Sequence, residues 1–92
     1  MGEVKHPGLK LKEVIVEKGI TFKSAAKEIG ISYILMSYLV NCHRRITLDI
    51  AIKLGRWLGN EYPVHYWVAA QFAYDIHVKA KAQGFSLEEA AQ

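Results

Sequence analysis

The sequence predicts an all-α fold, a bundle of five helices. Apolar residues recur at spacings of three and four, glycines stand where such helices would end, and Ser or Thr stands where they would begin. There is no strand-like alternation, no repeat and no low-complexity tract. The 92 residues suit one domain. We expect it to span residues 1–92, with a core at 7–83 and a short extension at 84–92.

The first helix is expected between Pro7 and Gly19. Proline suits the first position of a helix, because its missing N–H is not needed there, and the glycine closes the helix. The apolar residues at helical spacing between them are Leu11, Val14 and Ile15. Thr21 is placed to cap a second helix over residues 22–29.

Residues 20–47 are the most informative stretch. Gly30 can adopt the left-handed conformation that ends a helix, and Ser32 can cap the next helix through its hydroxyl. Ala25 and Ala26 are small where the second helix would lie close to its neighbour. The residues with the spacing of a shared core are Ile29, Ile31, Met36 and Leu39. This pattern predicts a helix-turn-helix, whose second helix, here running to about residue 40, normally enters the DNA major groove.

A fourth helix is expected after a basic loop at residues 41–45. Thr47 would cap it, Asp49 lies in its first turn, where the helix dipole favours an anion, and Gly59 would end it. Its predicted buried side chains are Ile50, Ala51, Leu54, Trp57 and Leu58.

The fifth helix is expected to be the longest. After a turn at residues 60–63, Pro63 would begin this helix, which would run to about residue 83, and Gly84 would stop it. Residues 86–89 have a capping-box pattern that predicts a short terminal helix.

The amino-acid composition limits the classes of protein to which this chain can belong. Residues 1–59 carry ten Lys or Arg against five Asp or Glu, whereas residues 60–92 carry two against four; a basic amino-terminal part is expected for phosphate binding. The single cysteine, Cys42, excludes an internal disulfide and a cysteine-cluster zinc site, which fits a reducing cytoplasm. No apolar run approaches the roughly 20 residues that cross a bilayer, and residues 1–7 are too polar for a signal peptide. We expect a soluble cytoplasmic protein whose hydrophobic share of 51% favours dimerisation.

The candidate DNA contacts lie on the third expected helix and the loop after it. Tyr and Ser hydroxyls can meet base edges or phosphates, and Ile34 or Leu35 can meet thymine methyl groups. Basic loop side chains would contact phosphates in a salt-sensitive way without reading sequence. The predicted set is Lys23, Ser32, Tyr33, Ile34, Ser37, Tyr38, Asn41, His43, Arg44 and Arg45. No Arg, Lys, Gln or Asn lies between Ser32 and Val40, so a protein-binding role for this apolar helix stays open.

The fifth helix carries the candidate interface residues. They are Tyr66, Trp67, Gln71, Phe72, Tyr74 and Asp75. The aromatic ones fit core packing as well as a dimer or partner surface, and a structural role is favoured for Gln71 and Asp75. The four histidines are not spaced to share a metal ion, and adjacent Cys42 and His43 point in different directions, so neither a metal, a cofactor nor a catalytic site is expected.

Four pieces of the sequence are typical of one family. They are His6-Pro7-Gly8; Ala26, Gly30 and Ser32 followed by Leu39 and Asn41; the stretch Arg44-Arg45-Ile46-Thr47; and Trp67, Gln71, Tyr74 and Asp75. Over about residues 7–76 the chain therefore resembles the HigA/VapI antitoxins, a branch of the lambda-repressor-like (XRE) helix-turn-helix proteins. It departs from the pattern of this family at two kinds of position. Cys42 stands where glycine is usual, and apolar or aromatic residues stand where polar ones are usual, at Phe22, Tyr33, Ile34 and Leu35.

The resemblance implies a homodimeric antitoxin that is not itself an enzyme. Such a protein binds a palindromic operator in double-stranded DNA, represses its own operon and neutralises a HigB-type toxin, a ribosome-dependent mRNA endonuclease. Two alternatives stay open. One is the same fold acting as a protein-binding module, a toxin neutraliser or adaptor with little or no DNA readout. The other is a phage-type transcriptional regulator without a toxin partner.

Overall fold

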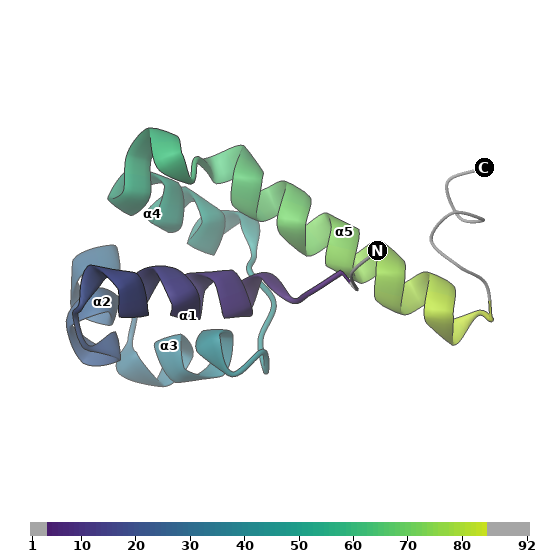
Figure 1. Cartoon of the computed structure of the whole chain (residues 1–92), viewed down its shortest axis with the longest axis horizontal. Helices are drawn as coiled ribbons and strands as arrows, with labels where there is room; N and C mark the ends of the chain where they lie inside the picture. The colour runs from purple at the N-terminus through teal and green to yellow at the C-terminus, as the bar shows by residue number, and fades with distance from the viewer. Residues whose placement is uncertain (1–3, 85–92) are drawn as a thin grey trace.

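The chain forms a helical bundle from which the last helix projects. The computed structural model describes residues 4–84, so the terminal helix predicted at 86–89 lies outside the described residues. Over residues 4–84 there is no strand, and the elements are α1 (Pro7–Lys18), α2 (Phe22–Ile29), α3 (Tyr33–Val40), α4 (Leu48–Leu58), the 3-10 helix η1 (Gly59–Glu61) and α5 (Val64–Ala82). In Figure 1, α1 crosses the middle of the bundle, with α3 below it and α4 above it. The predicted all-α, helix-turn-helix fold class is confirmed.

The helix ends follow the predicted chemistry. The hydroxyl of Thr21 accepts the backbone N–H of Ser24 at 3.0 Å, and the hydroxyl of Ser32 accepts that of Leu35 at 3.0 Å. At the helix-turn-helix corner, Gly30 ends α2 in the left-handed conformation, with φ of 94°. Each cap satisfies a backbone group that the helix itself leaves without a partner, so the local sequence fixes where α2 ends and α3 begins.

The connection between α4 and α5 differs in detail from the prediction. Instead of a simple turn at 60–63, Gly59–Glu61 form one turn of 3-10 helix. Pro63 is the N-cap of α5, in an extended conformation, and Val64 is the first helical residue. The Trp67 indole N–H donates to the Tyr62 carbonyl at 3.1 Å, which fastens the connection to the start of α5.

The largest fully buried side chain of the core is an indole. Trp67 is fully buried, together with the large side chains of Leu11, Ile15, Met36, Leu39 and Leu54. The predicted buried stripe of α4 is correct for Ile50, Ala51 and Leu54, whereas Trp57 and Leu58 are only half-buried. The Trp57 indole N–H instead donates to the Glu28 carboxylate at 3.0 Å, which ties α4 to α2.

A glycine allows two helices to approach closely. A Cβ atom at Gly8 would lie 1.9 Å from the Leu39 carbonyl oxygen, well inside contact distance, so α1 packs against the end of α3 only because this residue has no side chain. In the part of the chain described here, no helix is long and apolar enough to cross a bilayer.

Candidate nucleic-acid interface

The third helix has one buried side and one open side. Met36, Leu39 and Val40 are buried in the core, and Leu35 is half-buried against it. On the open side, the exposed fractions are 55% for Tyr33, 67% for Ile34 and 46% for Tyr38. We call Tyr33, Ile34, Ser37 and Tyr38 the exposed α3 face, because the spacings of three and four place them on one side of the helix. In a helix-turn-helix this is the side that meets a base-pair edge.

The start of the exposed α3 face borders an apolar hollow. The hollow has a volume of about 540 Å³ and is lined by Val16, Ile20, Thr21, Phe22, Lys23 and Tyr33. Lys23 is exposed at its rim, on the first turn of α2. The predicted contact residues Lys23 and Tyr33, from two different helices, are therefore brought to one place.

The loop after α3 has a fixed backbone. Asn41 is the C-cap of α3, and its side-chain N–H donates to the Ser37 carbonyl at 2.8 Å. Cys42 follows in the left-handed region, with φ of 62°, and the backbone N–H of His43 donates to the Tyr38 carbonyl at 2.8 Å. The amide of Asn41, predicted to face DNA, is thus partly occupied by its own helix.

The surroundings of Cys42 disfavour its thiolate form. Burial raises the pKa of its side chain, and the positive charge of Lys12 offsets only part of that effect. Thiolate is the nucleophilic and metal-binding form, so a raised pKa makes both uses unfavourable. Within residues 4–84 there is no group of three or more His, Cys, Asp or Glu that could hold a metal ion.

The basic loop is fastened to α5 by a chain of polar contacts. The Arg45 guanidinium forms an ion pair with the Asp75 carboxylate, and the Gln71 side-chain N–H donates to the other oxygen of that carboxylate at 2.9 Å. The Gln71 carbonyl oxygen accepts the buried backbone N–H of Ile46 at 2.7 Å. One face of α5 therefore holds the loop through both a charge and a backbone contact.

His6 reaches the same place from the amino-terminal side. Its Nδ1 accepts the backbone N–H of Gly8 at 2.9 Å, which caps α1, and its ring meets that of Tyr74 edge-on at 5.0 Å. Burial lowers the pKa of His6, while the Asp75 charge and a hydrogen bond with the Arg44 backbone partly counteract that effect. We call His6, Arg45, Ile46, Gln71 and Asp75 the loop junction.

Arg44 and Arg45 differ in their surroundings. Both are exposed, but only Arg45 is paired with a carboxylate. Arg44 forms no ion pair with any residue in the range 4–84. The full positive charge of Arg44 is therefore available to an anion, whereas that of Arg45 is partly neutralised by α5.

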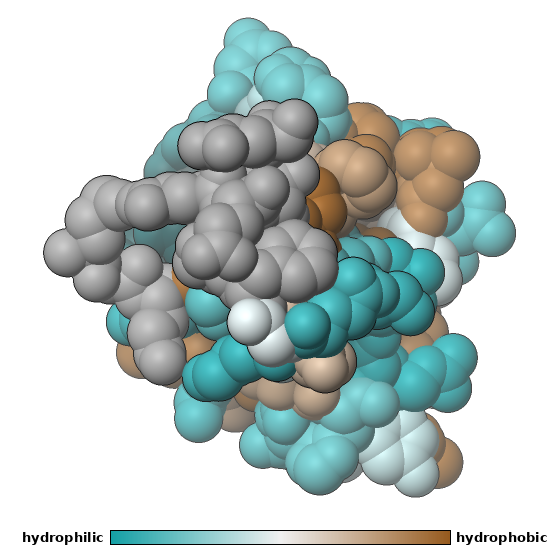
Figure 2. Space-filling model, turned by 90° about the vertical axis from the view of Figure 1, so that its right-hand side faces the viewer, coloured by the Kyte–Doolittle hydropathy of each residue, from teal (hydrophilic) through white to brown (hydrophobic). Residues whose placement is uncertain are grey.

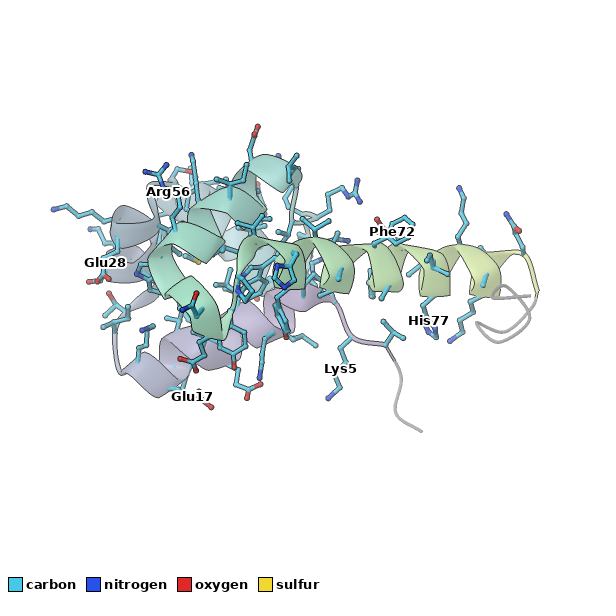
Figure 3. The ribbon with its side chains drawn as sticks, turned by 90° about the horizontal axis from the view of Figure 1, so that it is seen from above. Lys5, Glu17, Glu28, Arg56, Phe72 and His77 are labelled. Atoms are coloured by element: carbon cyan, nitrogen blue, oxygen red, sulfur yellow. The ribbon has the colours of Figure 1, made fainter. Side chains whose placement is uncertain are left out.

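The predicted interface residues on α5 fall into three groups by burial. For Trp67 and Gln71 the core interpretation holds and a surface role is wrong, because their side chains are 0% and 4% exposed. Tyr66 and Tyr74 are half-buried, and Asp75 is half-buried and paired with Arg45. Phe72 alone of the six is fully at the surface, with 65% of its area exposed. Figure 3 shows Phe72 and His77 on opposite sides of α5.

An apolar surface beside Phe72 was not predicted from the sequence. Leu48 and Val68, which are 62% and 40% exposed, line a shallow hollow with Phe72, and Ile52 lies one helical turn beyond Leu48. We call Leu48, Ile52, Val68 and Phe72 the α4–α5 patch. The end-on view in Figure 2 shows apolar surface gathered at the upper right, toward α4 and the start of α5. The signal for it in the sequence is that Leu48 and Ile52 lie outside the buried stripe of α4 at a spacing of four.

The fold and this surface define a helix-turn-helix protein. No model of a known protein family matches the sequence. The chain is 34% identical over 71 residues to virulence-associated protein A' of Dichelobacter nodosus, covering 77% of this chain and 61% of that protein. It is 32% identical over 75 residues to virulence-associated protein A of the same organism, covering 77% of this chain and 70% of that protein. The chain belongs to this family of virulence-associated proteins.

A solved structure from another organism is also similar. It is a "putative antidote protein of plasmid maintenance system" from Nostoc punctiforme, with a TM-score of 0.71 and 28% sequence identity. The match covers 89% of this chain and 94% of that one. The chain thus spans nearly all of this structure but only about three fifths of virulence-associated protein A'.

Proposed function

We propose that the protein is a DNA-binding antitoxin of the HigA/VapI type, acting in the cytoplasm as a homodimer. It would bind a palindromic operator, repress its own operon and neutralise a HigB-type mRNA endonuclease. The observation that carries the proposal is an open α3 face continuous with a basic loop, on a chain similar to an antidote protein. No catalytic step is assigned to the protein itself.

The charge distribution supports contact with DNA. Lys23, His43 and Arg44 are exposed around the exposed α3 face, and Lys12 lies close enough to Cys42 to influence the pKa of its thiol. Phosphate contacts of this kind place a helix in the groove, while base contacts read the sequence. The loop would supply the phosphate contacts, and the exposed α3 face would supply the base contacts.

The α4–α5 patch supports self-association. Four exposed apolar side chains on two packed helices leave a continuous surface that water does not favour, and Phe72 is the aromatic anchor that interfaces typically contain. A dimer with a two-fold axis is the assembly that a palindromic site requires. The dimer contact would then be the patch, rather than the buried residues of α5.

DNA binding is tested by titration. Purified protein is measured by fluorescence anisotropy against DNA from upstream of its own gene and against scrambled DNA, at low and near-physiological salt. We expect preferential binding of about 10³-fold or more. Equal, weak binding to both duplexes would contradict the autorepressor part of the proposal.

Arginine variants test the loop. Arg44→Ala should weaken binding to all sequences and lower the salt slope by about 0.9 for each phosphate that the variant no longer neutralises. Arg45→Ala should have a smaller effect, because Asp75 already holds that guanidinium. Unchanged DNA binding by both variants would show that this loop does not bind the DNA backbone.

The patch is tested by sedimentation. Phe72→Asp should shift the protein from dimer to monomer, since it places a charge in the apolar contact. Leu9→Asp, at an exposed position on α1, is the matched control and should stay dimeric. A dimer that survives Phe72→Asp would mean that another surface carries self-association.

One observation favours a second candidate function, a protein-binding module. The exposed α3 face carries a 67%-exposed Ile34 and a 55%-exposed Tyr33, and such side chains also suit a protein partner. Co-expression with a toxin encoded next to the gene distinguishes the two. Rescue of growth that depends on Ile34, in a protein that binds no DNA, would favour the module.

A further inference from the structure

The residues of the exposed α3 face restrict how a base could be read. The strong pairings with guanine and adenine use the side chains of Arg, Lys, Asn or Gln, which can bond two base atoms at once. None of these lies between Ser32 and Val40, and the amide N–H of Asn41 is directed to the Ser37 carbonyl at 2.8 Å. A groove-reading helix normally carries such side chains at these positions. This helix instead offers hydroxyl groups and apolar surface there.

Among the apolar and aromatic side chains of the exposed α3 face, Ile34 is the most exposed. It is 67% exposed, whereas its apolar neighbour Leu35 is half-buried against the core. Tyr33 and Tyr38 flank it on the same side of the helix, so the apolar surface at Ile34 is bordered by two rings. The major groove presents one apolar group on its base edges, the 5-methyl group of thymine.

The geometry points to thymine methyl groups as the feature of the operator that α3 reads, with Ile34 as the specificity-determining residue. This inference rests on the proposed DNA-binding function and specifies its ligand. The surrounding charge matches a DNA duplex: exposed Lys23 lies at one end of the α3 face, and exposed Arg44 follows the other end. Cations at both ends favour a polyanion, whose phosphates would position the helix.

The loss of one thymine methyl contact should have a measurable effect on DNA affinity. Removing a buried methyl group costs about four-fold in affinity, from the transfer free energy of about 0.8 kcal/mol for one carbon. Replacing thymine by deoxyuridine removes only that methyl group and leaves the base pair and its O4 acceptor in place. The substitution therefore separates methyl contact from hydrogen bonding at the same position.

The test begins with duplexes selected by the full chain from a random library. In the selected sequence each thymine is replaced by deoxyuridine, one position at a time, and the affinity is measured. We expect at least one position in each half-site at which the replacement weakens binding about four-fold. In Ile34→Ala the thymine and deoxyuridine duplexes should bind equally well, because the contacting side chain is gone.

The control variant is Leu9→Ala. Leu9 is an exposed leucine on α1, outside the exposed α3 face, so this variant should keep the full sensitivity to deoxyuridine. Thermal unfolding of both variants should match that of the original protein, since both side chains are exposed. Loss of sensitivity in Ile34→Ala alone assigns the methyl contact to that residue.

The outcomes separate this inference from the proposed function. If a specific duplex is selected but every deoxyuridine replacement changes affinity less than two-fold, methyl readout is overturned and the DNA-binding function stands. If sensitivity persists in Ile34→Ala, the contact is made by another residue and the assignment to Ile34 is overturned. If no duplex is enriched over random sequence, the proposed DNA function fails, and the inference fails with it.

Discussion

The exposed α3 face and the loop junction use their residues differently. On the α3 face, the side chains of Ile34 and Tyr33 are 67% and 55% exposed. In the loop junction, Gln71 is 96% buried and bonded at both ends. One region has side chains available for a partner, and the other has side chains committed to the fold.

This difference separates binding from stability. Substitutions on exposed surfaces usually change the free energy of unfolding by less than about 0.5 kcal/mol, so changes on the α3 face should alter binding alone. Removing one partner of a buried polar pair costs more, because the remaining group is left unsatisfied. Changes at the loop junction should therefore lower stability first.

Gly8→Ala should have the largest effect on stability. The new Cβ atom would lie 1.9 Å from the Leu39 carbonyl oxygen, and displacing a backbone atom in a packed interface costs about 2–3 kcal/mol. Denaturant unfolding measures the loss. Leu9→Ala, at the exposed neighbouring position, is the control and should change stability by less than about 0.5 kcal/mol. A stable Gly8→Ala variant would mean that α1 can shift away from α3.

Gln71→Leu comes next. It removes the acceptor of the buried Ile46 N–H and the donor to Asp75, which should destabilise the protein by about 2 kcal/mol. Asp75→Asn breaks only the half-exposed pair with Arg45 and should cost less than about 1 kcal/mol. Ile34→Ala on the α3 face serves as the control that leaves the unfolding midpoint unchanged. Equal losses in Gln71→Leu and Ile34→Ala would remove the contrast between the two regions.

Cys42→Gly should stabilise the protein. Cys42 holds a φ of 62°, a conformation that costs a residue with a side chain about 1 kcal/mol and glycine almost nothing. The expected gain of about 1 kcal/mol is measured by thermal unfolding. Cys42→Ala keeps the strain and should show no gain, which distinguishes backbone relief from loss of the thiol.

His6 should give a small pH dependence. Because its folded-state pKa is lowered, the unfolded chain takes up a proton first as the pH falls below about 6.5. The stability it contributes is therefore fully present above that pH and is lost toward the lower folded-state pKa. Unfolding is compared at neutral and mildly acidic pH with that of His6→Asn, which keeps a capping oxygen but cannot titrate. Identical pH profiles in the two proteins would show that His6 does not contribute.

The local parts of the fold could be predicted because their causes are local. Ser32 caps α3, and Gly30 ends α2, through contacts within a few residues, so the helix-turn-helix follows from a short stretch of sequence. The prediction for α5 succeeded less well. Apolar and aromatic residues occur on several sides of this helix, and periodicity alone does not distinguish the buried Trp67 from the exposed Phe72.

Residue types and their local spacing were enough to predict α1 to α4 with their ends, the existence of α5, the basic loop, and the absence of Arg, Lys, Asn and Gln between Ser32 and Val40. Each of these depends on residue type or on neighbours within one or two turns. Tertiary packing decided that Arg45 is held by Asp75, 30 positions away, and that Leu48 and Phe72 share one patch. The physical reason is that such contacts depend on how α4, α5 and the loop pack together, which no local pattern specifies.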